Sequence, residues 1–140
     1  MSPSSDPSFF LDRGLGSRIV AEALRDAGWR VETMDERYGK AESQRIEDVQ
    51  WISEATANGD VLLCKDLRIT VNPLEAQCLY MNSARVFGIP NGNLRGPQMA
   101  ALYLRYRQEI FDMSKRASGP FVVAVSPEGL RRRRLAYPPQ

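Results

Sequence analysis

The chain reads Phe9-Phe10-Leu11-Asp12 near its start and Val61-Leu62-Leu63-Cys64-Lys65-Asp66 near its middle. Each stretch is a short apolar run that ends in an aspartate, and a strand buried in a parallel sheet has this continuous apolar character. In open α/β sheets, ligands bind at the carboxyl ends of the strands. We therefore expect Asp12 and Asp66 to converge at one edge of a sheet, where paired carboxylates most naturally hold a hard divalent metal ion.

The rest of the chain alternates between strand-like and helix-like segments, which predicts an α/β fold with a mostly parallel sheet. A helix should follow the first strand, end at Gly28 and bury one apolar face, made of Leu15, Ile19, Ala23 and Leu24. The expected strands are 8–12, 29–34, 60–66, 85–89, 121–125 and 130–136; the other expected helices are 46–57, 73–84 and 97–118; the expected loops are 35–44 and 90–97.

Length and composition indicate one globular domain. The chain has 140 residues, of which 43% are hydrophobic and 26% charged, and this is enough for a single packed core. We expect a disordered segment at 1–7, one domain at 8–136 and a tail at 137–140. The sequence has neither a secretory signal at its N-terminus nor an apolar stretch long enough to span a membrane, so the expected location is the cytoplasm.

The absence of histidine limits the chemistry that the chain can perform. It excludes Ser-His-Asp and Cys-His catalysis and every zinc site that needs imidazole. The two cysteines, Cys64 and Cys78, lack the spacing of a metal or redox motif, and Cys64 lies in an apolar run where a buried thiol is expected. Carboxylates, hydroxyls, lysine, arginine and a bound metal ion remain.

A third carboxylate fits the pair. Asp48 lies in the first turn of the expected 46–57 helix, bordering its apolar face, whereas Glu47 projects about 100° away from it. Three clustered carboxylates repel one another unless a cation is present, and Mg²⁺ or Mn²⁺ suits all-oxygen ligands. The flanking basic residues would hold phosphates, or are ordinary surface charge: Lys65, Arg68 and Arg13. Each aspartate also has a purely structural alternative as a turn or helix-capping residue.

Two further features leave alternatives open. The run Arg131–Arg134 would contact phosphates or an acidic partner, or it belongs to a solvated final strand, in which alternation puts two arginines on each face. The long helix that Pro97 opens carries an apolar stripe with two tyrosines, which is either core or a homodimer interface. The stripe consists of Met99, Tyr103, Tyr106, Ile110 and Met113.

These pieces, in this order, resemble the PIN-like domain superfamily, in particular the PIN-like ribonuclease toxins of bacterial type II toxin-antitoxin pairs. The matching segments are Phe9–Asp12, Asp48–Ile52, Val61–Ile69, Asn72–Glu75 and Gly119–Val123. The resemblance implies a three-layer α/β/α sandwich, a Mg²⁺ or Mn²⁺ site, cleavage of single-stranded RNA and a cognate antitoxin protein as partner.

The resemblance also implies site residues. The acids of the family fall on Asp12, Asp48 and Asp66, and its basic positions beside the last acid fall on Lys65 and Arg68. The chain departs from the family at the fourth acid: Asn72 is neutral, and Glu75 is the nearest clear carboxylate after Asp66. The number of metal ions is therefore open, with Glu47 and Glu75 as the candidate additional acids.

Three hypotheses follow. The first is a metal-dependent endoribonuclease of the PIN-like class that acts as a toxin, with metal-activated water attacking the phosphodiester. The second is a PIN-like interaction module without catalysis, in keeping with the reduced acidic set. The third is a receiver-like signalling domain phosphorylated on Asp66, although Asp12 is followed by Arg13 rather than by a second acid, and no lysine ends the strand at 121–125.

Overall fold

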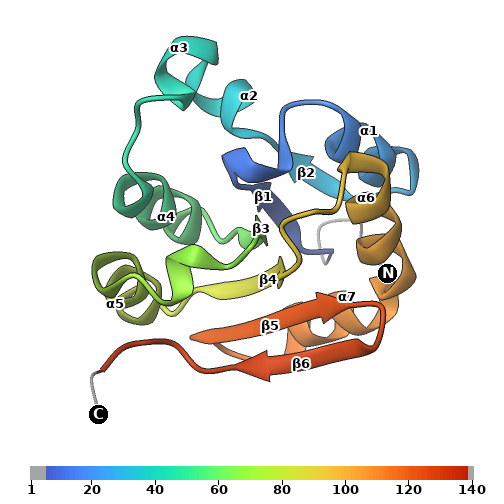
Figure 1. The fold of residues 1–140 in the computed structure, drawn as a ribbon. Helices are drawn as coiled ribbons and strands as arrows, with labels where there is room; N and C mark the ends of the chain where they lie inside the picture. The colour runs from blue at the N-terminus through green and yellow to red at the C-terminus, as the bar shows by residue number, and fades with distance from the viewer. Residues whose placement is uncertain (1–5, 139–140) are drawn as a thin grey trace.

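A computed structural model describes residues 6–138, and within them the strands form a six-stranded sheet with the order β2-β1-β3-β4-β5-β6 (Figure 1). Of the segments expected to be disordered or tail, residues 1–5 and 139–140 lie outside the described residues. The strands are β1 (Ser8–Leu11), β2 (Arg30–Glu32), β3 (Val61–Lys65), β4 (Arg85–Ile89), β5 (Phe121–Ser126) and β6 (Gly129–Arg133).

The first five strands run parallel, and β6 returns antiparallel to β5. Phe9 pairs with Val61, so β1 and β3 are neighbours in the sheet. The backbone N–H of Asp12 continues this pairing by donating to the Leu63 carbonyl at 3.0 Å. As expected, the carboxyl ends of the two strands that precede Asp12 and Asp66 therefore lie next to each other.

Helices cover both faces of the sheet, which confirms the three-layer α/β/α architecture (Figure 1). Odd-numbered side chains of β1, such as Phe9, pack with α1, α6 and α7, while Phe10 packs with α4 and α5 on the opposite face. The α-helices are α1 (Ile19–Asp26), α2 (Met34–Tyr38), α3 (Lys40–Ser43), α4 (Asp48–Ala57), α5 (Pro73–Met81), α6 (Gly96–Arg105) and α7 (Arg107–Arg116); the short 3-10 turns are η2 (Arg13–Leu15) and η3 (Arg68–Thr70).

The prediction of a loop at 35–44 was wrong, because this segment forms α2 and α3. A reciprocal capping box starts α2: the Thr33 hydroxyl accepts from the Glu36 N–H at 3.1 Å, and the Glu36 carboxylate accepts from the Thr33 N–H at 2.9 Å. The spacing Thr-x-x-Glu was a helix-start signal in a segment that otherwise looked too polar for a helix.

Two other expectations needed correction. The helix expected at 97–118 is two helices, which meet at Tyr106. Its stripe lies inside the molecule, with Tyr103 fully buried, so that the stripe is core rather than a homodimer interface. Ile19 is about half exposed, because α1 begins at this residue and turns Val20 and Leu24 into the core instead.

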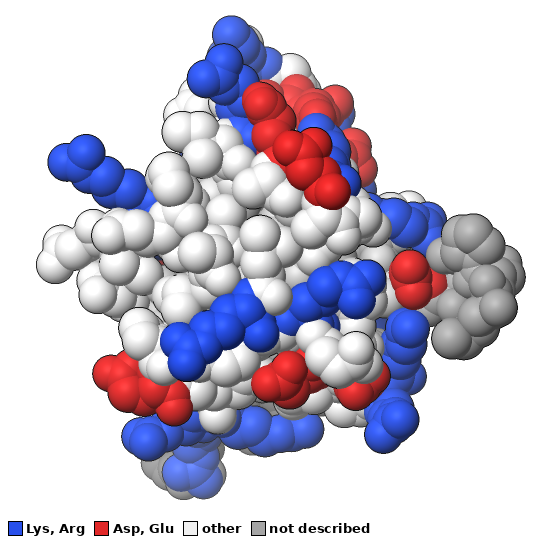
Figure 2. All heavy atoms as spheres, turned by 90° about the vertical axis from the view of Figure 1, so that its right-hand side faces the viewer, with Lys and Arg blue, Asp and Glu red and all other residues white. Residues whose placement is uncertain are grey.

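Charge of both signs is spread over the surface. The sequence has 19 Lys and Arg against 17 Asp and Glu. On the face displayed in Figure 2, basic side chains lie in a row across the middle, and acidic side chains lie in a group near the top and in smaller groups below the row. None of the helices within residues 6–138 has the length and apolar character that crossing a membrane requires.

Candidate active site

Asp12 directly follows β1, has an extended backbone, and has a side chain that points into the protein. Carboxylate oxygen Oδ2 accepts the backbone N–H of Lys65 at 3.3 Å. The other oxygen, Oδ1, is shut off from solvent and accepts no hydrogen bond from any residue in the described range. A buried acceptor without a partner costs free energy comparable to a lost hydrogen bond, so a ligand that binds this oxygen would remove that cost.

Burial also makes the Asp12 carboxyl reluctant to ionise. Desolvation raises its pKa from 3.8 to about 7, and the nearby charge of Asp66 acts in the same direction. The backbone N–H groups of Lys65, Gly14 and Leu15 oppose the shift without cancelling it. A cation beside Asp12 would reverse this shift, because an opposite charge favours the ionised form.

Asp66 follows β3 in a sharp turn. Asp66 and Leu67 both have left-handed backbones, with φ values of 58° and 61°, and the Asp66 N–H donates to the Ile89 carbonyl of β4 at 2.7 Å. The turn buries Leu67 over Gly88, where an added Cβ would lie only 2.1 Å from Leu67 Cδ2. This turn carries the Asp66 side chain out of the strand, where its Oδ1 accepts the Arg68 N–H at 3.1 Å.

Asp48 begins α4, and two side chains hold the same one of its oxygens. Oδ1 accepts from Arg13 Nη1 at 3.0 Å and from Trp51 Nε1 at 2.8 Å. Within residues 6–138 no group donates a hydrogen bond to the second oxygen, Oδ2. Asp48 is therefore oriented through one oxygen while the other stays available to a ligand.

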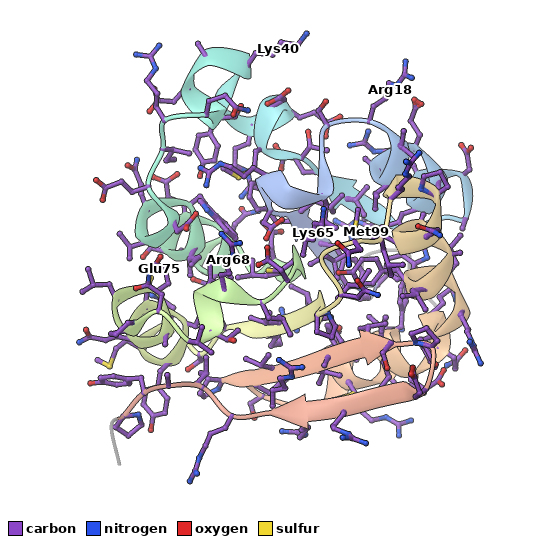
Figure 3. All side chains as sticks on the ribbon, in the orientation of Figure 1. Arg18, Lys40, Lys65, Arg68, Glu75 and Met99 are labelled. Atoms are coloured by element: carbon purple, nitrogen blue, oxygen red, sulfur yellow. The ribbon has the colours of Figure 1, made fainter. Side chains whose placement is uncertain are left out.

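The three aspartates line one cavity of about 220 Å³. It lies beside the ends of β1 and β3 and the start of α4, and Figure 3 places the labelled Lys65 and Arg68 there, near the centre of the molecule. The residues that line it are Asp12, Arg13, Gly14, Asp48, Trp51, Lys65, Asp66, Arg68 and Ile69.

The three basic residues differ in how firmly they are held. The Arg13 guanidinium is engaged on three sides, by Asp48 and by the carbonyls of Ser43 and Ile46 at 3.2 and 2.7 Å. The Arg68 side chain is 88% exposed, and its Nε lies 3.6 Å from Asp66 Oδ2. Lys65 is half buried at the end of β3. Lys65 and Arg68 therefore remain available to an anionic ligand, whereas Arg13 forms an ion pair with Asp48.

The two additional acids lie outside this cavity. Glu47 and Glu75 line a neighbouring groove of about 300 Å³ between α4 and α5, which shares only Arg13 and Asp48 with the cavity. Figure 3 shows Glu75 on α5, to the left of Arg68. Neither acid lines the space next to Asp12, so neither takes the position of a fourth ligand there.

The three aspartates offer the oxygen ligands that a hard divalent ion prefers, although their carboxylates do not lie close together. Within residues 6–138, no three His, Cys, Asp or Glu side chains stand close enough to hold one ion. Two observations nevertheless favour a cation beside Asp12: Oδ1 lacks a partner, and the space next to it exists because residue 14 is glycine. A Cβ at Gly14 would lie 3.1 Å from both Asp12 Oδ1 and Lys65 Cβ.

Sequence reasoning missed Trp51 and Gly14 as parts of the site. The i, i+3 spacing of Asp48 and Trp51 was a signal for the first, since it places the two side chains on one helical face. The contact of Gly14 with Asp12 depends on how η2 folds back over β3, and no local pattern announces it.

Comparisons with known proteins identify relatives of this chain. The model of a family described as "PIN like domain" matches residues 7–91, which contain all three aspartates. The chain is also 35% identical, over 123 residues, to a protein of Mycobacterium tuberculosis named "Putative ribonuclease VapC45", and the match covers 88% of each chain. No solved structure matches the chain.

Proposed function

The chain belongs to the PIN-like domain family, and from that premise we propose that it is a metal-dependent endoribonuclease that cleaves single-stranded RNA. The similarity to a protein named as a ribonuclease supports the reaction class. Family membership also leaves the receiver-like hypothesis without support.

One observation carries the proposal: Asp12, whose Oδ1 is buried without a hydrogen-bond partner, lines a cavity together with Asp48 and Asp66. Folding would not retain a desolvated carboxylate beside two others unless something compensated for its cost. The free Oδ2 of Asp48 and the half-exposed Asp66 supply further oxygen ligands on the other sides of the same space.

The side chains take distinct roles in this proposal. Asp12, Asp48 and Asp66 would hold Mg²⁺ or Mn²⁺, which when bound supplies Lewis acidity at the scissile phosphate. Trp51 and Arg13 orient Asp48 by fixing its Oδ1. Lys65 and Arg68 bind the phosphates, since they are the basic groups of the cavity whose charge is not enclosed by protein.

We further propose that the protein is the toxin of a toxin-antitoxin pair and acts in the cytoplasm. A cognate antitoxin would then be its protein partner and RNA its substrate. The support is the match to the ribonuclease-named relative over most of both chains together with the resemblance described above.

The test is Mn²⁺-dependent cleavage of single-stranded RNA by the wild type and Asp66→Asn. Asp26→Asn is the matched control, because Asp26 is an exposed aspartate at the end of α1 that does not line the cavity. We expect cleavage by the wild type and the control and loss in Asp66→Asn. Equal cleavage by all three proteins would refute the assignment.

The absence of a three-residue ligand cluster within residues 6–138 supports a second candidate, a PIN-like interaction module that binds without cutting. Titration calorimetry with Mn²⁺ near neutral pH separates the two. Binding that disappears in Asp12→Asn favours the enzyme, and no heat of binding in the wild type favours the module.

A further inference from the structure

Strand β6 forms one edge of the sheet, where it pairs only with β5 within the described residues, and it carries a run of arginines. Arg131, Arg132, Arg133 and Arg134 are all exposed, and within residues 6–138 none of their side chains forms a hydrogen bond or an ion pair. Other arginines of the chain differ in this respect: an ion pair with at least one carboxylate is formed by each of Arg13, Arg25 and Arg37. The charge of β6 is therefore free for an external partner.

Strand alternation divides these arginines between the two faces. Arg131 lies opposite Ala124 and Arg133 opposite Val122, and both of these partners belong to the core beneath α4 and α5. Residues directly opposite each other in an antiparallel pair share a face, so Arg131 and Arg133 project on the α4 and α5 side. Arg132 projects on the other side, where its guanidinium lies 5.4 Å from the centre of the Phe121 ring.

Arg131 and Arg133 border an open groove of about 280 Å³. One acid, Glu128, lies on its rim. The groove runs from the end of β4, past the end of β5, to β6. Its lining residues are Pro90, Ala124, Ser126, Glu128, Gly129, Leu130, Arg131 and Arg133.

This groove and the aspartate cavity are connected through the end of β4, although no residue lines both of them. Ile89, the last residue of β4, accepts the N–H of Asp66, and the next residue, Pro90, lines the groove. Since neighbouring strands are about 4.8 Å apart, β6 lies roughly 14 Å from β3, a few nucleotides of an extended strand away. Lys65 and Arg68 stand at one end of this path, and Arg131 and Arg133 stand at the other.

We propose that Arg131 and Arg133 bind the backbone of single-stranded RNA on one side of the cleavage site. The inference deepens the proposed ribonuclease function and rests on it. Two arginines two residues apart on a strand lie about 6.7 Å from each other along it, which lets them contact successive phosphates. An RNA strand suits the path better than an acidic peptide, because the path leads directly to the basic residues of the cavity.

The test measures RNA binding without cleavage. All proteins carry Asp66→Asn, and the probe is a fluorescein-labelled oligouridylate whose anisotropy is followed at several salt concentrations. Arg131→Ser/Arg133→Ser should weaken binding about tenfold and reduce the salt slope by about 1.4, the value for two lost phosphate contacts on a single strand. Arg132→Ser/Arg116→Ser removes the same charge from β6 and from α7 on the opposite face and should change binding far less.

Each other outcome overturns the inference. Equal losses in the two double variants would mean that only net charge matters. Unchanged RNA binding, with reduced binding of labelled polyglutamate, would mean that the strand recognises an acidic protein. Unfolding by urea checks that Arg132→Ser has not weakened its packing on Phe121.

Cleavage by the proteins without Asp66→Asn separates this inference from the proposed function. Hydrolysis of bis(p-nitrophenyl) phosphate, which is too small to reach β6, should be the same in wild type and Arg131→Ser/Arg133→Ser, while KM for RNA rises in the variant. If the wild type cleaves RNA and KM is unchanged in the variant, the inference about Arg131 and Arg133 is wrong, and the proposed ribonuclease function stands. If the wild type does not cleave RNA but its RNA binding still depends on these arginines, only the proposed ribonuclease function is wrong.

Discussion

Asp12 and Asp66 directly follow two adjacent parallel strands, yet their backbone conformations and their exposure to solvent differ. Asp12 has an extended backbone, a desolvated carboxylate and one oxygen without a partner. Asp66 has a left-handed backbone, stands half exposed and is satisfied locally by Arg68. The same sequence signal, an apolar run that ends in aspartate, thus produces one carboxylate whose hydrogen bonds a local turn provides and one that keeps a buried oxygen without a hydrogen-bond partner.

This difference suggests separate roles for the two carboxylates in binding a metal ion. A buried carboxylate binds a cation strongly because little water competes, but it is costly when empty. An exposed one costs little when empty and can exchange ligands. We therefore expect Asp12 to anchor the ion and Asp66 to complete the site, and the following predictions test this division.

The largest effect concerns cleavage. Asp12→Asn and Asp66→Asn should each lower RNA cleavage by about 10²-fold or more, the scale for removing one charge that stabilises a transition state. The division predicts that raising Mn²⁺ restores part of the activity of Asp66→Asn and none of that of Asp12→Asn. Initial rates over a Mn²⁺ series measure this, and equal rescue would show that the two acids are equivalent.

The next effect is the pH dependence of stability in the absence of metal. The pKa of Asp12 is about 7 in the folded protein and near 3.8 when unfolded. Between these values the folded state holds a proton that the unfolded state has lost, so the contribution of Asp12 to stability is complete below pH 3.8 and is lost as pH rises to 7. The loss is at most about 1.4 kcal/mol per pH unit.

Urea unfolding at pH 5 and pH 8 measures this difference. Asp12→Asn should lose this part of the pH dependence and be the more stable protein at pH 8. Asp66→Asn should keep most of the pH dependence of the wild type, because desolvation is the largest cause of the raised pKa of Asp12 and the charge of Asp66 only adds to it. A wild-type protein whose pH profile coincides with that of Asp12→Asn would contradict the burial of this charge.

A smaller effect is expected at Arg13, which extends the comparison to the third acid. Arg13→Ala removes a positive charge 3.0 Å from Asp48, so Mn²⁺ should bind several-fold more tightly, a modest gain because both side chains are about one-third exposed. Calorimetry with Arg45→Ala, which removes an exposed arginine from the connection between α3 and α4, controls for net charge. Weaker Mn²⁺ binding would mean that Arg13 chiefly positions Asp48.

The smallest effect is on the turn at Asp66. Asp66→Ala should lower the free energy of unfolding by about 1 kcal/mol, because alanine is disfavoured at positive φ and cannot accept the Arg68 N–H. Asp66→Asn should be nearly neutral, since asparagine tolerates the left-handed region. If both variants unfold at the same urea concentration, local backbone conformation does not account for the stability of this turn.

The parts of the fold that repeat a local pattern were predictable from sequence. The apolar runs ending at Asp12 and Asp66 marked neighbouring parallel strands, and the helical spacing around Asp48 brought the third acid to the same cavity. The helix α2 was missed although its Thr33–Glu36 capping box is a local signal, because the surrounding residues are polar and tertiary packing of Met34 decides the outcome.

What was not predictable depends on residues distant in sequence. The sequence did not predict that Arg13 binds Asp48 and the Ser43 and Ile46 carbonyls, which the connection between α3 and α4 brings to its guanidinium; its phosphate role stays a prediction. The left-handed turn at Leu67 depends on the missing side chain of Gly88. Both depend on contacts between elements, which spacing within one element cannot reveal.

The dependence of Asp66 on β4 has a consequence for protein synthesis. Asp12, Asp48 and Asp66 are all translated before residue 67, but the turn that presents Asp66 is held by the Ile89 carbonyl and by Leu67 packing on Gly88. A nascent chain thus possesses its acids before it possesses the arrangement that unites them. The ribosome must add the fourth strand before the growing polypeptide can bring the three aspartates to one cavity.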